Sequence, residues 1–329
     1  MGFSNIKGQD LTIQVLRNSM HNDSLSHAYL FVGPEGVGKK ATALALAQAL
    51  NCYNYSREQQ DSCNQCTSCR KVLSGNHPDI EVIEPDGLSI KIDQVRSVKN
   101  RVYYKSYESK YKVIIFNDAH FFTDQAANSL LKVLEEPPER TVFILVTSQP
   151  QKILPTILSR CQQVQFQRLP GGVIEEIFRD KYPEAQEKLP LLSALAGGSL
   201  SKMEDLLAAE DLLEKREETI SVLKNIDRMS MGDLLLWCEK WDKDNKGIRT
   251  VLEIIEFWFR DLLIWHTTHK EDLTINRDYI SYLKEEHYSL GSINRILDLL
   301  HKNLKYLENN VNPRLILEVI LLKIKLNLI

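Results

Sequence analysis

The stretch that decides the fold is HAYLFVGPEGVGKKATALALAQAL, residues 27–50. Its apolar run at 28–32 predicts a buried strand, and its Ala- and Leu-rich run at 38–50 predicts a helix. A glycine-rich loop joins the two. A phosphate-binding loop requires this order of strand, glycine loop and helix, because the backbone N–H groups at the start of the helix hold the phosphate.

The loop departs from the phosphate-binding pattern G-x-x-x-x-G-K-[ST] at one position. Gly33, Gly38 and Lys39 match the pattern, but Lys40 replaces the hydroxyl residue that would hold Mg²⁺. Gly33, Gly36, Gly38 and Lys39 could still cradle phosphates, since the backbone N–H groups do that work. We therefore expect a vestigial phosphate loop, and the sequence leaves open whether ATP binds to it.

A second departure lies at the end of a later apolar run, VIIFNDAH, residues 113–120. A hydrolysing phosphate-loop enzyme needs an acid for the Mg²⁺ ion and a residue that positions the attacking water. In one register Asn117 replaces the metal-binding Asp and Asp118 replaces the Glu. In the other register Asp118 serves the metal and Ala119 replaces the Glu. One carboxylate is missing either way, so we expect no Mg²⁺-dependent hydrolysis and no intrinsic ATPase activity.

Strands and helices alternate through the first half of the chain, which is typical of an α/β domain. Further strands are expected at 79–84, 112–117 and 141–147, and helices at 92–103 and 124–136. Near-continuous apolar strands that alternate with helices predict a parallel sheet covered on both faces.

After about residue 166 the pattern becomes helical. Short helices are expected at 172–181 and 187–208, around the turn AGGS at 196–199, and helices throughout the remainder. The last helix is predicted to begin with Asn312 as N-cap and Pro313 at its first position, and to run to Ile329. The sequence therefore predicts three domains: an α/β domain at 1–166, a helical lid at 167–208 and a helical domain at 209–329.

The composition is that of a soluble globular protein, with 43% hydrophobic residues, 26% charged residues and a formal net charge of −3. This charge argues against a protein that coats nucleic acid by bulk positive charge. No run approaches the roughly 20 apolar residues that span a bilayer. The first 25 residues mix polar and charged types unlike a signal peptide. We expect a cytoplasmic protein without a membrane partner.

Four of the six cysteines, Cys52, Cys63, Cys66 and Cys69, lie in one polar insertion at about 52–70. In a reducing compartment such a cluster favours a metal site over disulfides. Four thiolates suit tetrahedral Zn²⁺, and two-residue gaps let neighbouring sulfurs turn toward one ion. Four protein ligands leave no position for water, so the prediction is a structural Zn²⁺ site; four thiols without a metal are the alternative.

Several segments together resemble bacterial clamp-loader subunits of the AAA+ family. They are LSHAYLF with the phosphate loop, the four-cysteine insertion, ANSLLKVLEEPPERTVFILVTSQP at 127–150 and ILSRCQ at 157–162. The resemblance covers residues 1 to about 205, whereas the helical remainder matches only in length and character. It implies an AAA+ domain, a small helical lid and a C-terminal helical collar through which subunits assemble.

The resemblance also assigns a role to the motif Ser159-Arg160-Cys161. It implies that Arg160 is an arginine finger, which reaches the ATP held by a neighbouring motor subunit and stabilises charge on the transferring phosphoryl group. The alternative is an arginine that only pairs with a carboxylate at a domain edge. In the segment GGSLSK, Ser201 stands where motor subunits carry an Arg that senses the γ-phosphate.

By resemblance the chain is a non-hydrolysing member of the family. Its implied partners are the motor (gamma/tau) and delta subunits, with the sliding clamp and primer-template DNA reached through the assembly. Two alternatives remain open at this point. One is an ATP-hydrolysing motor subunit, and the other is a zinc-dependent nucleic-acid-binding module with a decorative phosphate loop.

Overall fold

The computed structural model describes residues 2–56, 58, 60–209, 211–241, 245–306 and 311–326. The chain forms two compact units, Met1–Glu204 and Asp205–Ile329, and each is described by itself. The first unit contains both the predicted α/β domain and most of the predicted lid. The division into three domains therefore stays a prediction, and the predicted end of the last helix at Ile329 lies outside the described residues.

The first unit is built on one five-stranded sheet with the order β2-β3-β4-β1-β5, in which all neighbouring strands are parallel. Its strands are β1 (Ala28–Val32), β2 (Ile80–Ile83), β3 (Lys112–Phe116), β4 (Thr141–Thr147) and β5 (Gln162–Gln165). The four predicted strands are confirmed to within a residue or two. The edge strand β5 was not predicted.

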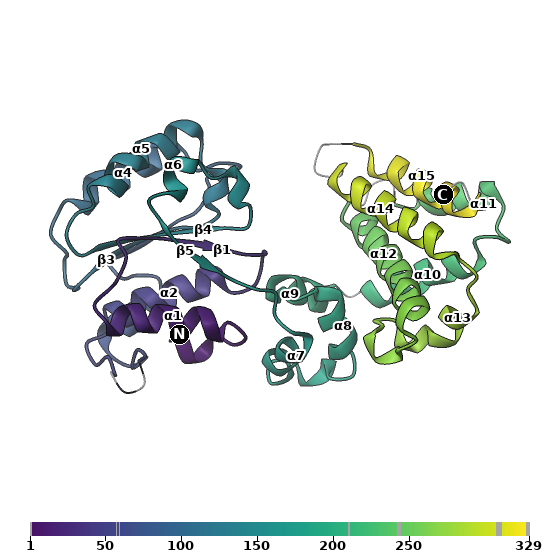
Figure 1. Ribbon diagram of the computed structural model, residues 1–329, viewed down its shortest axis with the longest axis horizontal. Helices are drawn as coiled ribbons and strands as arrows, with labels where there is room; N and C mark the ends of the chain where they lie inside the picture. The colour runs from purple at the N-terminus through teal and green to yellow at the C-terminus, as the bar shows by residue number, and fades with distance from the viewer. Residues whose placement is uncertain are drawn as a thin grey trace. The chain divides into compact units, whose positions relative to one another are not determined.

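Helices cover both faces of this sheet (Figure 1). The helices around it are α1 (Asp10–His21), α2 (Lys39–Leu50), α3 (Thr67–Leu73), α4 (Ile92–Val102), α5 (Asp124–Glu135) and α6 (Pro155–Leu158). Alternate residues of β1 face opposite layers: Tyr29 and Phe31 pack in the core with α1 and α2, whereas Leu30 packs in the core with α4 and α5. The predicted doubly covered parallel sheet is confirmed.

Three further helices complete the first unit and lead into the second: α7 (Gly171–Arg179), α8 (Leu189–Ala196) and α9 (Leu200–Ala208). The turn between α8 and α9 contains Gly197 and Gly198, both with positive φ. The N–H of Leu169 donates to the carbonyl of Gly198 at 3.1 Å, which ties this turn to the chain that leaves β5.

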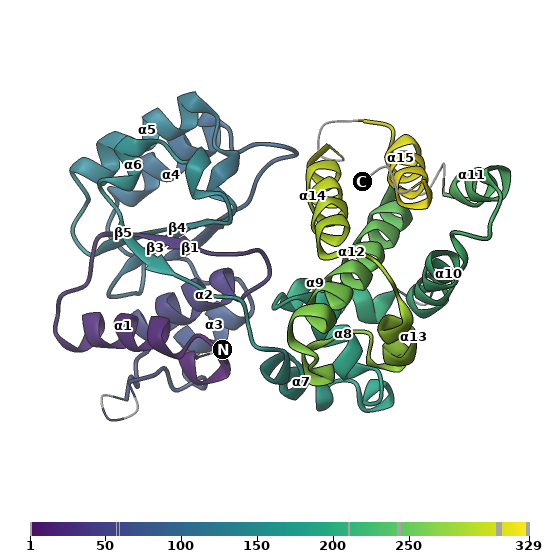
Figure 2. The same ribbon diagram turned by 45° about the vertical axis from the view of Figure 1, so that its right-hand side comes forward.

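The second unit is entirely helical in the residues that the structure describes. Its helices are α10 (Leu212–Asn225), α11 (Met231–Glu239), α12 (Asn245–Thr268), α13 (Ile280–Glu285), α14 (Leu290–Tyr306) and α15 (Pro313–Lys325). The long helix α12 runs through the middle, with α10, α14 and α15 packed on it (Figure 2). The Asn312 side chain accepts from the N–H of Arg314, which confirms the predicted start of the last helix.

Short 3-10 turns connect several of these elements: η1 (Phe3–Asn5), η2 (Ala119–Phe121), η3 (Pro150–Lys152), η4 (Pro183–Ala185), η5 (Glu271–Leu273) and η6 (Arg277–Tyr279). Among the described residues, none of the helices combines the length and the apolar character that crossing a bilayer requires.

Candidate functional site

The glycine loop lies between the end of β1 and the start of α2, as the sequence predicts. Gly36 has φ +73° and Gly38, which directly precedes α2, has φ +93°. Both values fall in the left-handed region that only glycine enters at little cost. The two glycines therefore give the loop its shape, and the first turn of α2 points its free N–H groups into it.

Lys39, the residue that would contact a phosphate, is bonded to the loop itself. Its side chain is 6% exposed, and its Nζ donates to the carbonyl of Gly33 at 2.7 Å and to that of Pro34. Burial lowers the pKa of Lys39, while the charge of Asp118 opposes that shift. In this conformation the Lys39 ammonium is hydrogen-bonded to carbonyl groups of the loop itself.

Lys40 leaves the loop and meets the sheet edge. Its Nζ lies 2.6 Å from Oε1 of Glu84, the residue that directly follows β2. The same carboxylate accepts from Nδ2 of Asn117 at 2.9 Å, and Asn117 also donates to Oδ2 of Asp118 at 2.9 Å. Burial raises the pKa of Glu84, but the hydrogen bonds from Lys40 and Asn117 outweigh it and lower the pKa. The Lys40 ammonium thus lies at the carboxyl ends of the strands, where a Mg²⁺ ion would need carboxylate ligands.

The two registers for the end of β3 differ in whether Asp118 or Ala119 stands in the place of the Glu. β3 ends at Phe116, and the N–H of Asn117 donates to the carbonyl of Ile83 at 2.9 Å. Ala119 is 1% exposed and packs in the core under α4 and α5. Asn117, by contrast, hydrogen-bonds to both Glu84 and Asp118, which favours the register with Asn117 in the place of the metal-binding Asp.

The turn that follows α8 packs directly on the glycine loop. The N–H of Leu200 donates to the carbonyl of Gly36 at 2.8 Å. A Cβ on Gly36 would lie 2.1 Å from Oγ of Ser199 and 2.2 Å from Oγ of Ser201. Ser201, which stands where a phosphate-sensing Arg is expected, is thus in contact with the loop.

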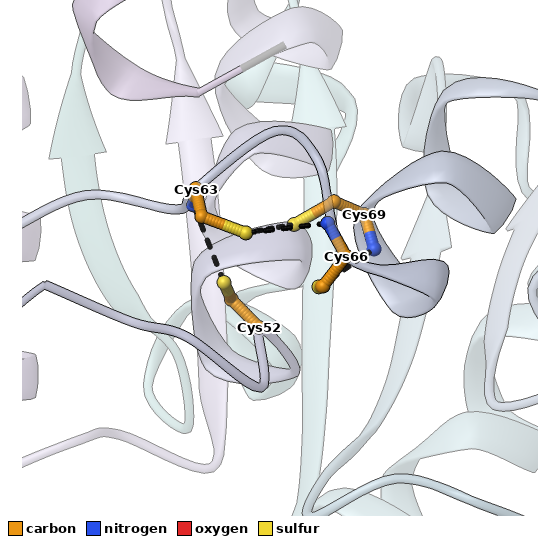
Figure 3. Close-up of side chains that lie close together, drawn as sticks. All are labelled: Cys52, Cys63, Cys66 and Cys69. Carbon is orange, nitrogen blue, oxygen red and sulfur yellow. Dashed lines mark hydrogen bonds between the residues drawn. The ribbon is translucent and has the colours of Figure 1, made fainter.

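The four cysteines of the insertion come together, as predicted (Figure 3). Their Sγ atoms all lie within 4.8 Å of one another, and those of Cys63 and Cys69 are 4.0 Å apart. Sulfurs about 2.3 Å from a tetrahedral Zn²⁺ ion stand about 3.8 Å from one another. The donor set and its spacing therefore fit a tetrahedral metal ion, which Cys52, Cys63, Cys66 and Cys69 could hold.

Backbone N–H groups point at these sulfurs. The N–H of Cys63 donates to Sγ of Cys52 and that of Cys66 to Sγ of Cys63, each at 3.3 Å. Burial raises the pKa of Cys63, but the N–H groups of Gln65 and Cys66 outweigh it and lower the pKa to about 6. Such N–H donors stabilise thiolates, the form in which cysteine binds a metal.

The segment after the cysteine cluster is anchored by a buried acid that the sequence did not single out. Asp79 is 5% exposed, and its carboxylate accepts from the N–H groups of Tyr107, Glu108 and Ser109 at 2.7 to 3.0 Å. Burial raises the pKa of Asp79, but these hydrogen bonds outweigh it and lower the pKa. Glu108 in turn lies 2.6 Å from Nζ of Lys71 on α3, which joins the cysteine insertion to the loop before β3.

Arg160 lies just before β5, directly after the short helix α6. Its Nη1 donates to the carbonyl of Thr156 at 2.9 Å and to Oγ of Ser159 at 3.2 Å, and its Nη2 lies 2.6 Å from Oε1 of Glu135. Cys161 is 9% exposed within the core that includes α5 and α6, and burial raises its pKa to about 12. Cys161 therefore packs, and it has no activated thiol.

The structure does not bring Arg160 and the glycine loop to one place. In the register between β1 and β5, Tyr29 lies beside Gln162 and Val32 beside Gln165. Arg160 precedes the first of these pairs and the glycine loop follows the last. At about 3.3 Å per strand residue, the two ends are at least about 10 Å apart. Arg160 therefore lies at the amino ends of the parallel strands, and the chain's own phosphate loop lies at their carboxyl ends.

Comparisons with known proteins place the chain in a family. The family model described as "DNA polymerase III, delta subunit" matches residues 8–170, and the one described as "DNA polymerase III, delta subunit, C terminal" matches residues 210–325. DNA polymerase III subunit delta' of Bacillus subtilis is 32% identical over 96% of this chain and 96% of its own length. The delta' subunit of Pseudomonas aeruginosa is 33% identical over 91% of both chains.

Tau and gamma/tau subunits of DNA polymerase III are also similar to the chain, but the chain covers a smaller share of their length. DNA polymerase III subunit tau of Bacillus subtilis is 28% identical over 98% of this chain, which spans 61% of the length of that protein. The delta' proteins, by contrast, match over more than nine tenths of both chains. The chain therefore belongs to the DNA polymerase III delta' subunit family.

Proposed function

We propose that the chain is a non-hydrolysing subunit of the replicative clamp loader, which supplies Arg160 to the ATP held by a neighbouring motor subunit. The observation that carries this proposal is that Arg160 and the chain's own phosphate loop lie at opposite ends of the parallel strands. A guanidinium placed there lies away from a nucleotide in the chain's own loop, which supports a role at a nucleotide that another chain holds. Its side chain is 34% exposed, so a partner's phosphate can reach it.

The state of the chain's own phosphate loop supports the non-hydrolysing role. Lys40 pairs with Glu84, and Asn117 donates to the same carboxylate. A hydrolysing site would need Mg²⁺ held by a hydroxyl and an acid at these positions. The expected loss of ATPase activity thus rests on both sequence and geometry.

The proposal assigns the four-cysteine group a structural Zn²⁺ ion. All four ligands come from the protein, which closes the coordination sphere and leaves no position for a reacting water. The ion would tie the polar insertion to the end of α2, where Cys52 lies two residues after Leu50.

In the assembly, the chain would work with gamma/tau and delta subunits to open the sliding clamp and load it on primed DNA in the cytoplasm. The helices from α10 onward would form the collar through which subunits assemble. Contacts to the clamp and to DNA would be shared with the other subunits, consistent with a net charge of −3.

The test is reconstitution of the loader from motor, delta and either wild-type or Arg160→Ala chains. A finger supplied in trans is worth about 10³-fold or more at the site it serves. The variant should therefore assemble normally but lose ATP turnover at that one site. Arg179→Ala, which removes an exposed arginine from the end of α7, is the matched control and should behave as wild type. Unchanged turnover with Arg160→Ala contradicts the proposal.

The motor-subunit alternative rests on the similarity to tau and gamma/tau proteins. It predicts ATP turnover by the purified chain alone, abolished by Lys39→Ala. Our proposal predicts that neither the wild-type chain nor this variant turns over ATP.

A further inference from the structure

The guanidinium of Arg160 already has an anionic partner within its own chain. Nη2 of Arg160 lies 2.6 Å from Oε1 of Glu135, a residue 25 positions earlier at the end of α5. The side chains are 34% and 49% exposed, so the pair lies where a neighbouring subunit could approach it. Glu135 is the ion-pair partner of Arg160 among the described residues.

The other contacts of Arg160 are neutral and local. Nη1 donates to the carbonyl of Thr156 on α6 and to the hydroxyl of the adjacent Ser159. These two bonds hold one side of the guanidinium against α6 without adding charge. The other side, Nη2, is held by the carboxylate, so the two halves of the guanidinium have different kinds of partner.

A phosphate of the neighbour's ATP would need the donors that face away from α6. An arginine binds phosphate best through two parallel N–H groups on two different nitrogens, and Nη2 supplies one of them in either such pair. A carboxylate at 2.6 Å from Nη2 competes with a phosphate oxygen for the same donor, and two anions that share one cation repel each other. Engagement of the finger therefore requires that the carboxylate move away.

We infer that Glu135 is a positioning residue, a counter-ion that Arg160 exchanges for the phosphate of the neighbouring subunit's ATP. This inference rests on the proposed function of Arg160. Thr156 and Ser159 keep the guanidinium in place during the exchange, while Glu135 sets how readily the phosphate is accepted. Because the Arg160–Glu135 pair is partly exposed, solvent screens it. Its loss therefore changes how readily Arg160 accepts the phosphate by only a small factor.

The structure offers a matched control for Glu135. The next residue, Glu136, is also exposed, carries the same charge and is the C-cap of the same helix. Among the described residues it has no ion-pair partner. A general effect of lowering the negative charge at the end of α5 would appear in Glu136→Gln as well as in Glu135→Gln.

The experiment measures steady-state ATPase kinetics of the loader reconstituted with motor and delta subunits. Glu135→Gln should raise kcat/KM for ATP at the site it serves by about two- to fivefold, the range that partly exposed ion pairs allow. Glu136→Gln should leave kcat/KM unchanged. Glu135→Asp, which retains the carboxylate, should bring kcat/KM back toward the wild-type value. In an Arg160→Ala background, Glu135→Gln should have no effect, because the two residues act through one interaction.

The outcomes separate this inference from the proposed function. If Arg160→Ala leaves turnover unchanged, the proposed function itself fails. If Arg160→Ala lowers turnover but Glu135→Gln equals wild type, lowers kcat/KM, or acts equally in the Arg160→Ala background, Glu135 is not the exchanged counter-ion and the proposed function stands. Melting temperatures and assembly by gel filtration, measured for each variant, exclude misfolding as the cause of a lowered rate.

Discussion

The ammonium of Lys40 lies 2.6 Å from the carboxylate of Glu84, so the residue that replaces a magnesium-binding hydroxyl is neutralised within the chain. Glu84 follows one strand and pairs with this cation, and Asn117 follows the next strand and donates to the same carboxylate. Lys40, the residue that departs from the phosphate-loop pattern, is therefore held by specific contacts within the chain.

The first prediction concerns Lys40→Thr, which restores the hydroxyl of the phosphate loop. The isolated variant should still show no ATP turnover above background, because Asn117 remains in the place of the metal-binding acid. Both members of the Lys40–Glu84 pair are about half exposed, at 48% and 45%, so the variant should lose less than about 1 kcal/mol of unfolding free energy. Turnover that depends on Mg²⁺ would contradict this account of the site.

The second prediction concerns the metal. Protein purified without chelator should carry about one Zn²⁺ per chain by elemental analysis, and Cys63→Ser should carry much less because one of four ligands is lost. Cys161→Ala is the control, since Cys161 packs in the core and lies outside the cluster. Absence of zinc from the wild-type protein, or equal zinc in Cys63→Ser, would argue against the site.

The third prediction tests the contact between the glycine loop and the turn before α9. Gly36→Ala places a Cβ about 2 Å from two serine hydroxyls at φ +73°, whereas Gly75→Ala meets no atom within 4 Å at φ +72°. Both variants carry the backbone cost of about 1–2 kcal/mol for a side chain in the left-handed region. Only Gly36→Ala should lose more than that in chemical denaturation. Replacing Ser199 and Ser201 with Ala should recover part of the difference; equal losses in both glycine variants would show that the contact is dispensable.

The fourth prediction concerns Asp79 and pH. Its pKa in the folded protein is lowered from 3.8, so its contribution to stability is fully present above that value and is lost as pH falls through the lower folded pKa. Asp79→Asn should lower the unfolding free energy at pH 7 by about 1.5–3 kcal/mol, because an amide oxygen cannot match a carboxylate that accepts three N–H groups. The difference between variant and wild type should shrink when unfolding is measured below pH 4. A constant difference would mean that charge plays no part.

The elements that the sequence predicted best are those that carry a local signal. β1, the glycine loop and α2 follow from an apolar run, three glycines and an Ala-rich stretch. The start of α15 follows from Asn312 and Pro313. β5 lacked such a signal: only Val164 of its four residues is buried, and three glutamines are exposed. An edge strand beside a buried one needs little apolar sequence of its own, so propensity could not identify it.

The functional groups show the same division. The four cysteines were found because they lie close in sequence. Glu84 and Glu135 were missed because each pairs with a residue far along the chain, and only the folded sheet brings them together. The position of Glu84 directly after a predicted strand was the signal that could have identified it, since polar residues at the carboxyl edge of a parallel sheet gather at one site.

The opposite placement of Arg160 and the phosphate loop has a consequence for assembly. Suppose that each subunit offers an arginine at one end of its strands and a nucleotide at the other end. Such subunits join head to tail, through a heterologous interface. A subunit that keeps the arginine but does not hydrolyse ATP can supply its arginine to one neighbour. It has no ATP site that would need the arginine of a second neighbour. If the proposed function holds, this chain would stand at one end of the row of ATP sites, and a different kind of interface could form on its other side.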